Sequence, residues 1–355
     1  MRNDMEGIMY ITEHEIMLQH EALQKTVQRM LESKDAIRAF FSSCRKRRFI
    51  FIGCGSSYMI AKSAAHSFNC RKDVSAVAIA GGDYLVNPAH FEGMLHSSVV
   101  VLLSRSGLTS EIIRAAAHIR KTTDAKLVSV TMKAENDLVP LCELNLSFPW
   151  AYDESVCQTR TVTNLYAIIQ LLDAFYNEDA ELESSVVEAV RQNEAFKKDN
   201  RGALEAIAKM SFEKAVVLAD GPLAGLAEEA ALAFAEIAML RGSAYNFLDY
   251  RHGPMVLQTS NTLTLVAVQK VDNSYQQDML KELCKTGAAV LTLTQAGTEV
   301  PPEVTANFVI ENVPSFAACG IHFIYLAQML AFSMAVENGV NPDQPRGLNA
   351  YIALN

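Results

Sequence analysis

Two hydroxyl-rich segments, each directly after a short apolar run, carry the side chains best suited to hold a phosphate group. Hydroxyls beside the free amides at the start of a helix bind phosphate oxygens, and the helix dipole favours negative charge there. One such segment is usually only a helix cap, but two that meet at neighbouring strand ends predict a phosphate site. The candidate ligands are Gly55, Ser56, Ser57, Ser104, Arg105, Ser106 and Thr109.

Two other residues have the chemistry for proton transfer. Glu236 lies in the apolar stretch 230–240, where burial would raise the pKa of its carboxyl and suit it as a general base. His252 precedes Gly253-Pro254, a pair that predicts a fixed turn, and histidine exchanges protons near neutral pH. Each has a plainer alternative, which is a buried structural ion pair for Glu236 and a structural imidazole for His252.

A third polar segment, residues 154–161, contains Gln158, Thr159 and Arg160. These side chains either form a further wall of the same site or cap the helix that follows. Other motifs argue against a cofactor, because Tyr58 replaces the third glycine of a dinucleotide-binding GxGxxG turn. The sequence also has no Walker motif, no GxSxG elbow and no metal-ligand spacing. We therefore expect no cofactor and no metal ion.

The composition is typical of a globular protein of two or three domains. The chain has 355 residues, of which 50% are hydrophobic, and a formal net charge of −9. An acidic chain lacks the basic face that binds nucleic acid, so we expect no such partner. The seven scattered cysteines, without a CxxC pair, are typical of reduced thiols in a cytoplasmic protein. The apolar run 316–336 could span a membrane by length, but we interpret it as a buried helix and expect no membrane contact.

Strands and helices alternate along the chain around the polar segments. Apolar runs predict strands at 48–53, 74–80, 98–103, 126–132, 144–148, 214–219, 262–269, 288–294 and 308–311. Helical spacing is present at 11–46 (two helices), 58–68, 109–121, 159–176, 181–210, 223–240, 274–286 and 315–337. This alternation predicts an α/β fold with doubly wound parallel sheets. Carboxyl ends of parallel strands meet at one edge of a sheet, so the hydroxyl-rich segments should lie together.

The two halves of the chain repeat one strand-turn-helix unit. The turn that ends at Gly55 matches the turn that ends at Gly221, at an offset of 166 residues. The repeat predicts two tandem doubly wound domains, although two unrelated α/β domains would look similar. Asp220 would repel phosphate, so we expect the second copy to be structural and without ligand. The expected divisions are N-terminal helices over 1–46, a first domain with the phosphate site over 47–195, a second domain over 196–340 and a tail over 341–355 that closes over the site.

Five motifs, in this order, resemble the sugar isomerase (SIS) domain family. They are GCGSSY from residue 53, LSRSGLTSE from 103, ESVCQT from 154, AEIAMLRGSAYNFLDYRHGP from 235 and DQPRGLN from 343. The likeness extends over nearly the whole chain, from about residue 30 onward. It is strongest to the isomerase half of glucosamine-6-phosphate synthase and to stand-alone amino-sugar-phosphate deaminases and fructosamine-6-phosphate deglycases. The resemblance implies an enzyme with two SIS domains that acts on a phosphorylated sugar.

The resemblance also implies a role for each matching residue. Ser57, Ser104, Ser106 and Thr109 would bind the sugar phosphate, and Gly55, Ser56, Arg105, Gln158, Thr159 and Arg160 would contribute less directly. Glu236 would transfer the proton, and His252 would open the sugar ring in the site of a neighbouring subunit. A homodimer or higher homo-oligomer follows from that arrangement.

The sequence departs from the synthase in ways that bear on its reaction. Ala233 and Ala350 replace two lysines near the substrate carbonyl, Arg105 stands for glutamine and Gln158 stands for serine. No glutaminase domain precedes the first strand, so glutamine-dependent amino transfer is not expected. We expect loss of ammonia or an amino acid from an aminated sugar 6-phosphate. The alternatives are a plain aldose-ketose phosphate isomerase and a non-catalytic sugar-phosphate sensor; a transcription regulator would need a DNA-binding domain.

Overall fold

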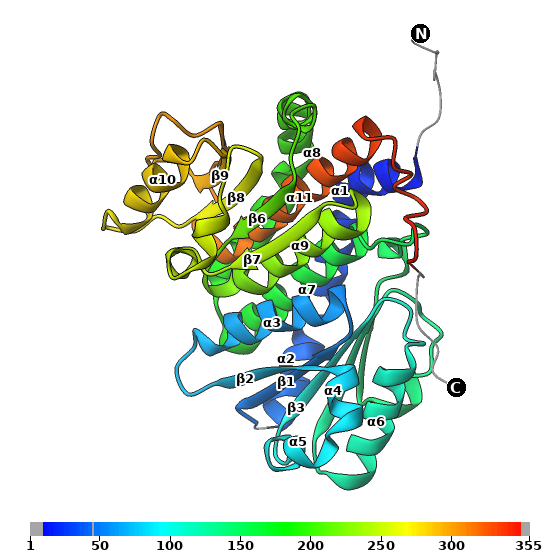
Figure 1. Cartoon of the computed structure of the whole chain (residues 1–355). Coiled ribbons are helices and arrows are strands. Elements are labelled where there is room, and N and C mark those ends of the chain that lie inside the picture. The colour runs from blue at the N-terminus through cyan, green and yellow to red at the C-terminus, as the bar shows by residue number, and fades with distance from the viewer. Residues whose placement is uncertain (1–9, 45, 349–355) are drawn as a thin grey trace.

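A computed structural model describes residues 10–44 and 46–348, and this part of the chain contains two parallel five-stranded sheets (Figure 1). The first consists of β1 (Arg48–Gly53), β2 (Ser75–Ala80), β3 (Val99–Ser104), β4 (Lys126–Thr131) and β5 (Leu144–Ser147). The second consists of β6 (Lys214–Leu218), β7 (Arg241–Tyr245), β8 (Thr262–Val268), β9 (Ala289–Gln295) and β10 (Ala306–Ile310). The orders β2-β1-β3-β4-β5 and β7-β6-β8-β9-β10 correspond strand for strand. The α/β class with parallel sheets is confirmed, and the matching orders support the predicted duplication.

Helices connect the strands and cover both sheets. The α-helices are α1 (Ile11–Glu32), α2 (Lys34–Cys44), α3 (Ser56–Asn69), α4 (Gly81–Val86), α5 (Pro88–Leu95), α6 (Ser110–Thr122), α7 (Arg160–Asn177), α8 (Ala180–Ala208), α9 (Ala224–Ile237), α10 (Tyr275–Lys285) and α11 (Gly320–Glu337). Short 3-10 turns are η1 (Val139–Leu141), η2 (Pro149–Ala151), η3 (Gly221–Leu223), η4 (Leu248–Arg251), η5 (Pro254–Leu257) and η6 (Phe316–Cys319). Of these, α4 and α5 were not among the helices expected from the spacing of apolar residues.

The largest apolar core lies between the two sheets and joins the halves of the chain. Figure 1 shows α3, α7 and α9 in the layer that separates β1–β3 from β6–β8. Gly225 permits the closest approach, because a Cβ there would lie 2.4 Å from the backbone oxygen of Met59. A larger residue at that position would push α9 away from α3 and disturb the packing of one half against the other.

The apolar run near the C-terminus forms the core helix that the sequence predicted. α11 is the one helix of the described residues that is long and apolar enough to cross a membrane. Its side chains are almost all buried inside the protein, from Ile321 to Ala335. Burial on every face explains why the sequence of this helix has no polar stripe.

Strand β7 is the main element that the sequence did not reveal. The helix before it, α9, is shorter than predicted because the chain turns into β7. The predicted helix over 223–240 ends at Ile237, and Met239 adopts a φ of +54° that turns the chain into β7. Gly242 then lets β7 lie close to α9, since a Cβ there would be 2.0 Å from the carbonyl oxygen of Ala231. β7 lies at a sheet edge and is half exposed, so its residues lack the apolar run by which the other strands were recognised.

The domain boundaries expected from the sequence stay predictions. The proposed boundary between 195 and 196 falls inside α8, a continuous helix of 29 residues that packs on both α1 and α11. Helices α1 and α2 occupy the part of 1–46 that is described, and residues 1–9 and 45 lie outside it. Most of the tail over 341–355 lies outside it too, since the description ends at Leu348.

Candidate active site

Both hydroxyl-rich segments meet at one edge of the first sheet. β1 and β3 pair in parallel, with Ile52 beside Leu102, so the chain leaves both strands at the same side of the sheet. A cavity of about 210 Å³ lies there. Its polar and charged lining comprises Ser56, Ser57, Ser104, Arg105, Ser106, Thr109, Glu111, Gln158 and Glu236, and Cys54, Gly55, Leu103, Ile112, Val156 and Leu348 complete it.

Two glycines shape the first segment. Gly55 adopts a φ of +53°, a conformation that side chains disfavour, and α3 starts at the next residue. At Gly53 a Cβ would lie 2.5 Å from the carbonyl carbon of Ser57, so the turn can close only without a side chain there. This tight turn places Ser56 and Ser57 in the first turn of α3, where the helix dipole favours an anion.

The second segment is held in shape by its own hydroxyls. The amide of Gly107 donates to Ser104 Oγ at 3.0 Å, and the amide of Leu108 donates to Ser106 Oγ at 3.1 Å. The hydroxyls of Ser104 and Thr109 are 3.4 Å apart, which brings two phosphate-binding candidates together. Gly107 has a φ of +65° and lies against Asn136, so a side chain at this position would displace the turn. The hydroxyls are thus preorganised around the cavity before any ligand binds.

Glu236 reaches this cavity from the last turn of α9, in the other half of the chain. Burial raises the pKa of its carboxyl to about 6, and the nearby guanidinium of Arg105 opposes that rise. Arg105 is itself buried and donates to the carbonyl oxygens of Ser155 at 3.1 Å and Val156 at 3.4 Å. A carboxyl with this pKa is ionised at neutral pH yet accepts a proton readily, which suits a general base.

Gln158 adds a polar group to the cavity lining, and Glu229 is a buried carboxyl beside Ser56 that does not itself line the cavity. The side-chain oxygen of Gln158 is buried at the cavity and has no hydrogen-bond partner within residues 10–44 and 46–348. Glu229 lies on α9, two turns before Glu236, and is 2% exposed. Burial raises the pKa of Glu229 well above its ordinary value, the charge of Glu236 raises it further, and a hydrogen bond from Ser56 lowers it. The sequence analysis missed Glu229, although its spacing of seven residues from Glu236 in an apolar helix could have revealed it.

Thr159 and Arg160 do not line the cavity. The amide of Thr159 donates to Asp153 Oδ2 at 3.0 Å, and its carbonyl accepts from Gln328 Nε2 at 2.9 Å. Arg160 makes ion pairs with Glu15 at 3.6 Å and Asp153 at 3.9 Å. The backbone of Thr159 and the side chain of Arg160 therefore hold the 153–160 loop, and Gln158 alone of the three predicted residues of this segment reaches the cavity.

A buried carboxylate on α1 anchors the same loop. Glu15 Oε1 accepts from the amide of Glu154 at 2.6 Å, and Oε2 accepts from the hydroxyl of Ser155. Burial and the neighbouring Asp153 raise the pKa of Glu15 to about 7, against the opposing effects of these hydrogen bonds and of Arg160. The N-terminal helix thus fixes the loop that carries Val156 and Gln158 into the cavity.

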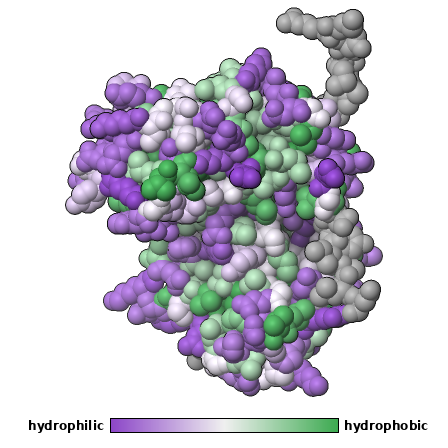
Figure 2. Space-filling view, in the orientation of Figure 1, coloured by the Kyte–Doolittle hydropathy of each residue, from purple (hydrophilic) through white to green (hydrophobic). Residues whose placement is uncertain are grey.

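His252 is exposed and is not part of the cavity lining within the described chain. It follows η4 in the second half, and Val256 and Leu257 nearby are 83% and 65% exposed. Figure 2 shows apolar side chains gathered on the surface of this half. Within the described residues, no group of three or more His, Cys, Asp or Glu side chains is arranged to hold a metal ion.

Comparisons with known proteins agree with this geometry. The model of the SIS domain matches residues 43–175, which contain both hydroxyl-rich segments. A glutamine–fructose-6-phosphate aminotransferase (isomerizing) of Bartonella henselae is 25% identical over 323 residues, covering 86% of this chain and 52% of the relative. The chain therefore spans about half the length of the curated relative that it matches.

Solved structures share the fold over almost the full chain. Glucosamine-6-phosphate deaminase from Thermotoga maritima is 25% identical with a TM-score of 0.78, covering 97% of this chain and 100% of its own. Tagatose-6-phosphate ketose/aldose isomerase from Escherichia coli has a TM-score of 0.80 at 20% identity and covers 96% of both chains. The resemblance inferred from the five motifs is confirmed, and residues 43–175 of the chain match the SIS domain.

Proposed function

We propose that this protein is a phosphosugar isomerase-type enzyme that removes ammonia or an amino acid from an aminated ketose or aldose 6-phosphate. The observation that carries the proposal is the meeting of Glu236 with the hydroxyls of Ser57, Ser104, Ser106 and Thr109 at one cavity. A pure phosphate-binding module would need the hydroxyls but would have no use for a half-buried carboxylate of raised pKa.

Phosphate binding is the first task of the site. The hydroxyls at the ends of β1 and β3, together with the starts of α3 and α6, bind the 6-phosphate. This contact is remote from the reacting carbons, so its binding energy serves to hold them against Glu236. Arg105 adds positive charge between the phosphate and the carboxylate.

Proton transfer is the second task. Once the sugar is open, Glu236 takes the proton from the carbon next to the carbonyl or imine, and the electrons of that C–H bond form the enediol or enolamine. Return of the proton to the neighbouring carbon gives the isomer, and hydrolysis of the resulting imine releases the amine. General base catalysis of this kind contributes roughly 10²–10⁴-fold.

Ring opening is assigned to His252 of a second copy of the chain. Its exposure, and the apolar surface formed by Val256 and Leu257 beside it, support a homodimer in which this segment is covered. His252 would then move a proton between the ring oxygen and the anomeric hydroxyl in the partner's cavity. The family resemblance, and not a distance within one chain, is the basis of this assignment.

The residue at position 233 bears on whether the site removes an amino group from its substrate or transfers one from glutamine. Ala233, one turn before Glu236, is 4% exposed and offers no amine to the substrate. Ala350, the other position where the synthase has a lysine, lies outside the described residues. The absence of an amine at position 233 favours removal of a substrate's own amino group over glutamine-dependent transfer.

Proton NMR in D₂O tests the proposal directly. The panel consists of glucosamine 6-phosphate, galactosamine 6-phosphate, fructose 6-phosphate, and the fructose- and glucose-derived 6-phosphate adducts of lysine. Deuterium uptake beside the carbonyl, with release of ammonia or lysine, is expected for one member. Exchange without amine release would replace the proposal with a simple aldose-ketose isomerase. Binding without any exchange would identify a sugar-phosphate sensor.

A further inference from the structure

A second and larger cavity lies at the corresponding edge of the other sheet. Its volume is about 810 Å³. Pro222 after β6, Lys270 after β8, Gln295 at the end of β9 and the segment 310–317 after β10 line it. These are the carboxyl ends of parallel strands on either side of the point where the strand order reverses, which is where open α/β sheets bind ligands.

The internal duplication relates the two cavities residue by residue. The offset of 166 residues that takes Gly55 to Gly221 also takes Cys70 to Glu236. Gly55 and Gly221 share the unusual backbone conformation, with φ of +53° and +57°. α3 begins at the first cavity and ends beside Cys70 at the second, whereas α9 begins beside the second and ends with Glu236 at the first. The second cavity therefore occupies the place of a ligand site in the repeated fold.

The side chains at equivalent positions differ in charge. Ile52 pairs with Leu102 in the first sheet, and Leu218 pairs with Val266 in the second. Ser106 lies four residues after Leu102 and Lys270 lies four residues after Val266, so these two side chains occupy equivalent positions. Leu223 stands at the position of Ser57, four residues after Ala219. The hydroxyl cluster of the first cavity is thus replaced by one exposed ammonium group.

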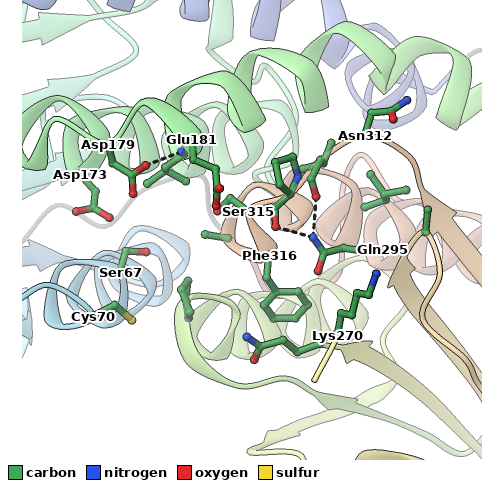
Figure 3. A pocket seen from close by; sticks show the side chains of 18 of the residues that line it. Ser67, Cys70, Asp173, Asp179, Glu181, Lys270, Gln295, Asn312, Ser315 and Phe316 are labelled. Atoms are coloured by element: carbon green, nitrogen blue, oxygen red, sulfur yellow. Dashed lines mark hydrogen bonds between the residues drawn. The ribbon is translucent and has the colours of Figure 1, made fainter. Parts of the chain in front are cut away.

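Acidic side chains form the wall opposite Lys270. Figure 3 shows Asp173, Asp179 and Glu181 together on one side of the cavity, and Lys270 with Gln295 on the other. Arg71 pairs with Asp173 at 3.2 Å and with Asp179 at 2.6 Å. These two carboxylates offset more than the single charge of Arg71, so the acidic wall keeps a surplus negative charge to which Glu181 adds.

Hydrogen bonds hold the remaining lining in place, and it offers both polar and apolar groups to a ligand. The side-chain amide of Gln295 donates to the carbonyl oxygens of Val313 at 2.7 Å and Pro314 at 2.8 Å, which fixes the 313–317 segment. The amide of Ser315 donates to Ser185 Oγ at 3.1 Å, which ties the same segment to α8. The ring of Phe316 lies between the charged walls and offers an apolar face (Figure 3).

We propose that this cavity is a second ligand site, which binds a small molecule that carries both an amino group and an anionic group. The ammonium end would lie against Glu181 and the Asp173–Asp179 pair, and the anionic end would lie against Lys270. A phosphate without an amine is disfavoured by the acidic wall. This proposal departs from the expectation that the second copy is structural and without ligand. An amino-sugar phosphate and a free amino acid share the required chemistry.

Calorimetry on a protein without its first site tests the proposal. The background is the full chain with Ser104→Ala and Ser106→Ala, which removes phosphate hydroxyls from the first cavity. Probes are glucosamine 6-phosphate, lysine, fructose 6-phosphate without an amine, and glucosamine without an anion. We expect saturable binding of glucosamine 6-phosphate or of lysine, and which of the two binds identifies the source of the ligand. Fructose 6-phosphate and glucosamine are expected to bind at least about tenfold more weakly.

Two surface variants connect the binding to this cavity. Lys270→Ala and Glu181→Gln are each expected to weaken binding about tenfold, whereas Lys281→Ala, an exposed lysine on α10, leaves it unchanged. No binding of either zwitterion, equal binding of fructose 6-phosphate, or binding that both variants leave unchanged would overturn the proposal. Because binding is assigned through variants of the second cavity, failure here is independent of the reaction proposed for Glu236.

Discussion

Arg105 and Glu236 come from opposite halves of the chain and meet at one cavity, where the guanidinium lowers the carboxyl pKa that burial raises. Arg105 follows β3 of the first sheet, and Glu236 ends α9 beside the second. The site consequently forms only when the halves pack together. The balance of the two effects leaves the carboxyl pKa at about 6, which sets the pH range in which this group can act as a base.

The pH dependence of turnover should report this balance. Glu236 must be ionised to accept a proton, so kcat should fall as pH drops through about 6. Arg105→Gln removes the opposing charge and should move that limb of the profile to higher pH, whereas Arg105→Lys should keep it near the wild-type position. An unchanged pH profile in Arg105→Gln would show that the charge of Arg105 does not influence the pKa of Glu236.

Replacement of the proposed base should abolish chemistry without abolishing binding. Glu236→Gln is expected to lower the rate of deuterium exchange at least about 100-fold, because the amide cannot take up the proton. Calorimetric affinity for the sugar phosphate should change by less than about threefold. Ser43→Ala, at an exposed position on α2, is the control variant and should keep the wild-type exchange rate and affinity. Wild-type exchange in the glutamine variant would exclude Glu236 as the base.

The hydroxyl cluster should control substrate affinity. Ser104→Ala and Ser106→Ala each remove a hydrogen bond to a charged group, which is worth roughly 1.5–3 kcal/mol. We expect KM to rise about 10- to 150-fold in each variant with little change in kcat, as for contacts made equally in the ground and transition states. Steady-state kinetics measure both constants. A fall in kcat with an unchanged KM would assign the serines to the chemical step.

Glu15 should make the stability of the protein depend on pH. Its pKa is raised from 4.5 to about 7, so the folded state binds a proton that the unfolded chain has already lost. The associated stability is present below about pH 4.5 and is lost as pH rises to about 7. Relative to Glu15→Gln, the wild type should therefore lose stability over this range, as measured by denaturant unfolding. If the stabilities of the wild type and of Glu15→Gln changed in parallel with pH, the assignment would be contradicted.

Subunit complementation should reveal whether His252 acts across an interface. Glu236→Gln and His252→Asn are each expected to be inactive as homo-oligomers. When the two are mixed and reassembled, a hybrid dimer carries one intact site, so a fraction of wild-type turnover should return. Size-exclusion chromatography with light scattering establishes the oligomeric state in parallel. Two inactive variants that stay inactive in a verified hybrid would place His252 in its own subunit's site.

The order of strands and helices could be read from the sequence because each buried parallel strand is a near-continuous apolar run. The SVVVLL run before Ser104 and the RFIFIG run before Cys54 marked two strands, and the polar residues after each marked the site. Gly55 and Gly107 each adopt a positive φ in the turns that follow these strands. The half-exposed β7 has no apolar run, so its place could not be predicted.

The sequence by itself determined the α/β elements, the hydroxyl cluster and the candidate base, because local spacing and residue type carry that information. Tertiary packing decided which candidates share a cavity. Helix α9 brings Glu236 to the cavity that Ser56 lines, whereas Thr159 and Arg160 lie outside it and hold the 153–160 loop. Tertiary packing also created the cavity between Lys270 and the acidic wall, whose residues come from both halves. Contacts between residues more than a hundred positions apart depend on how the helices between the sheets pack, and no local pattern records that geometry.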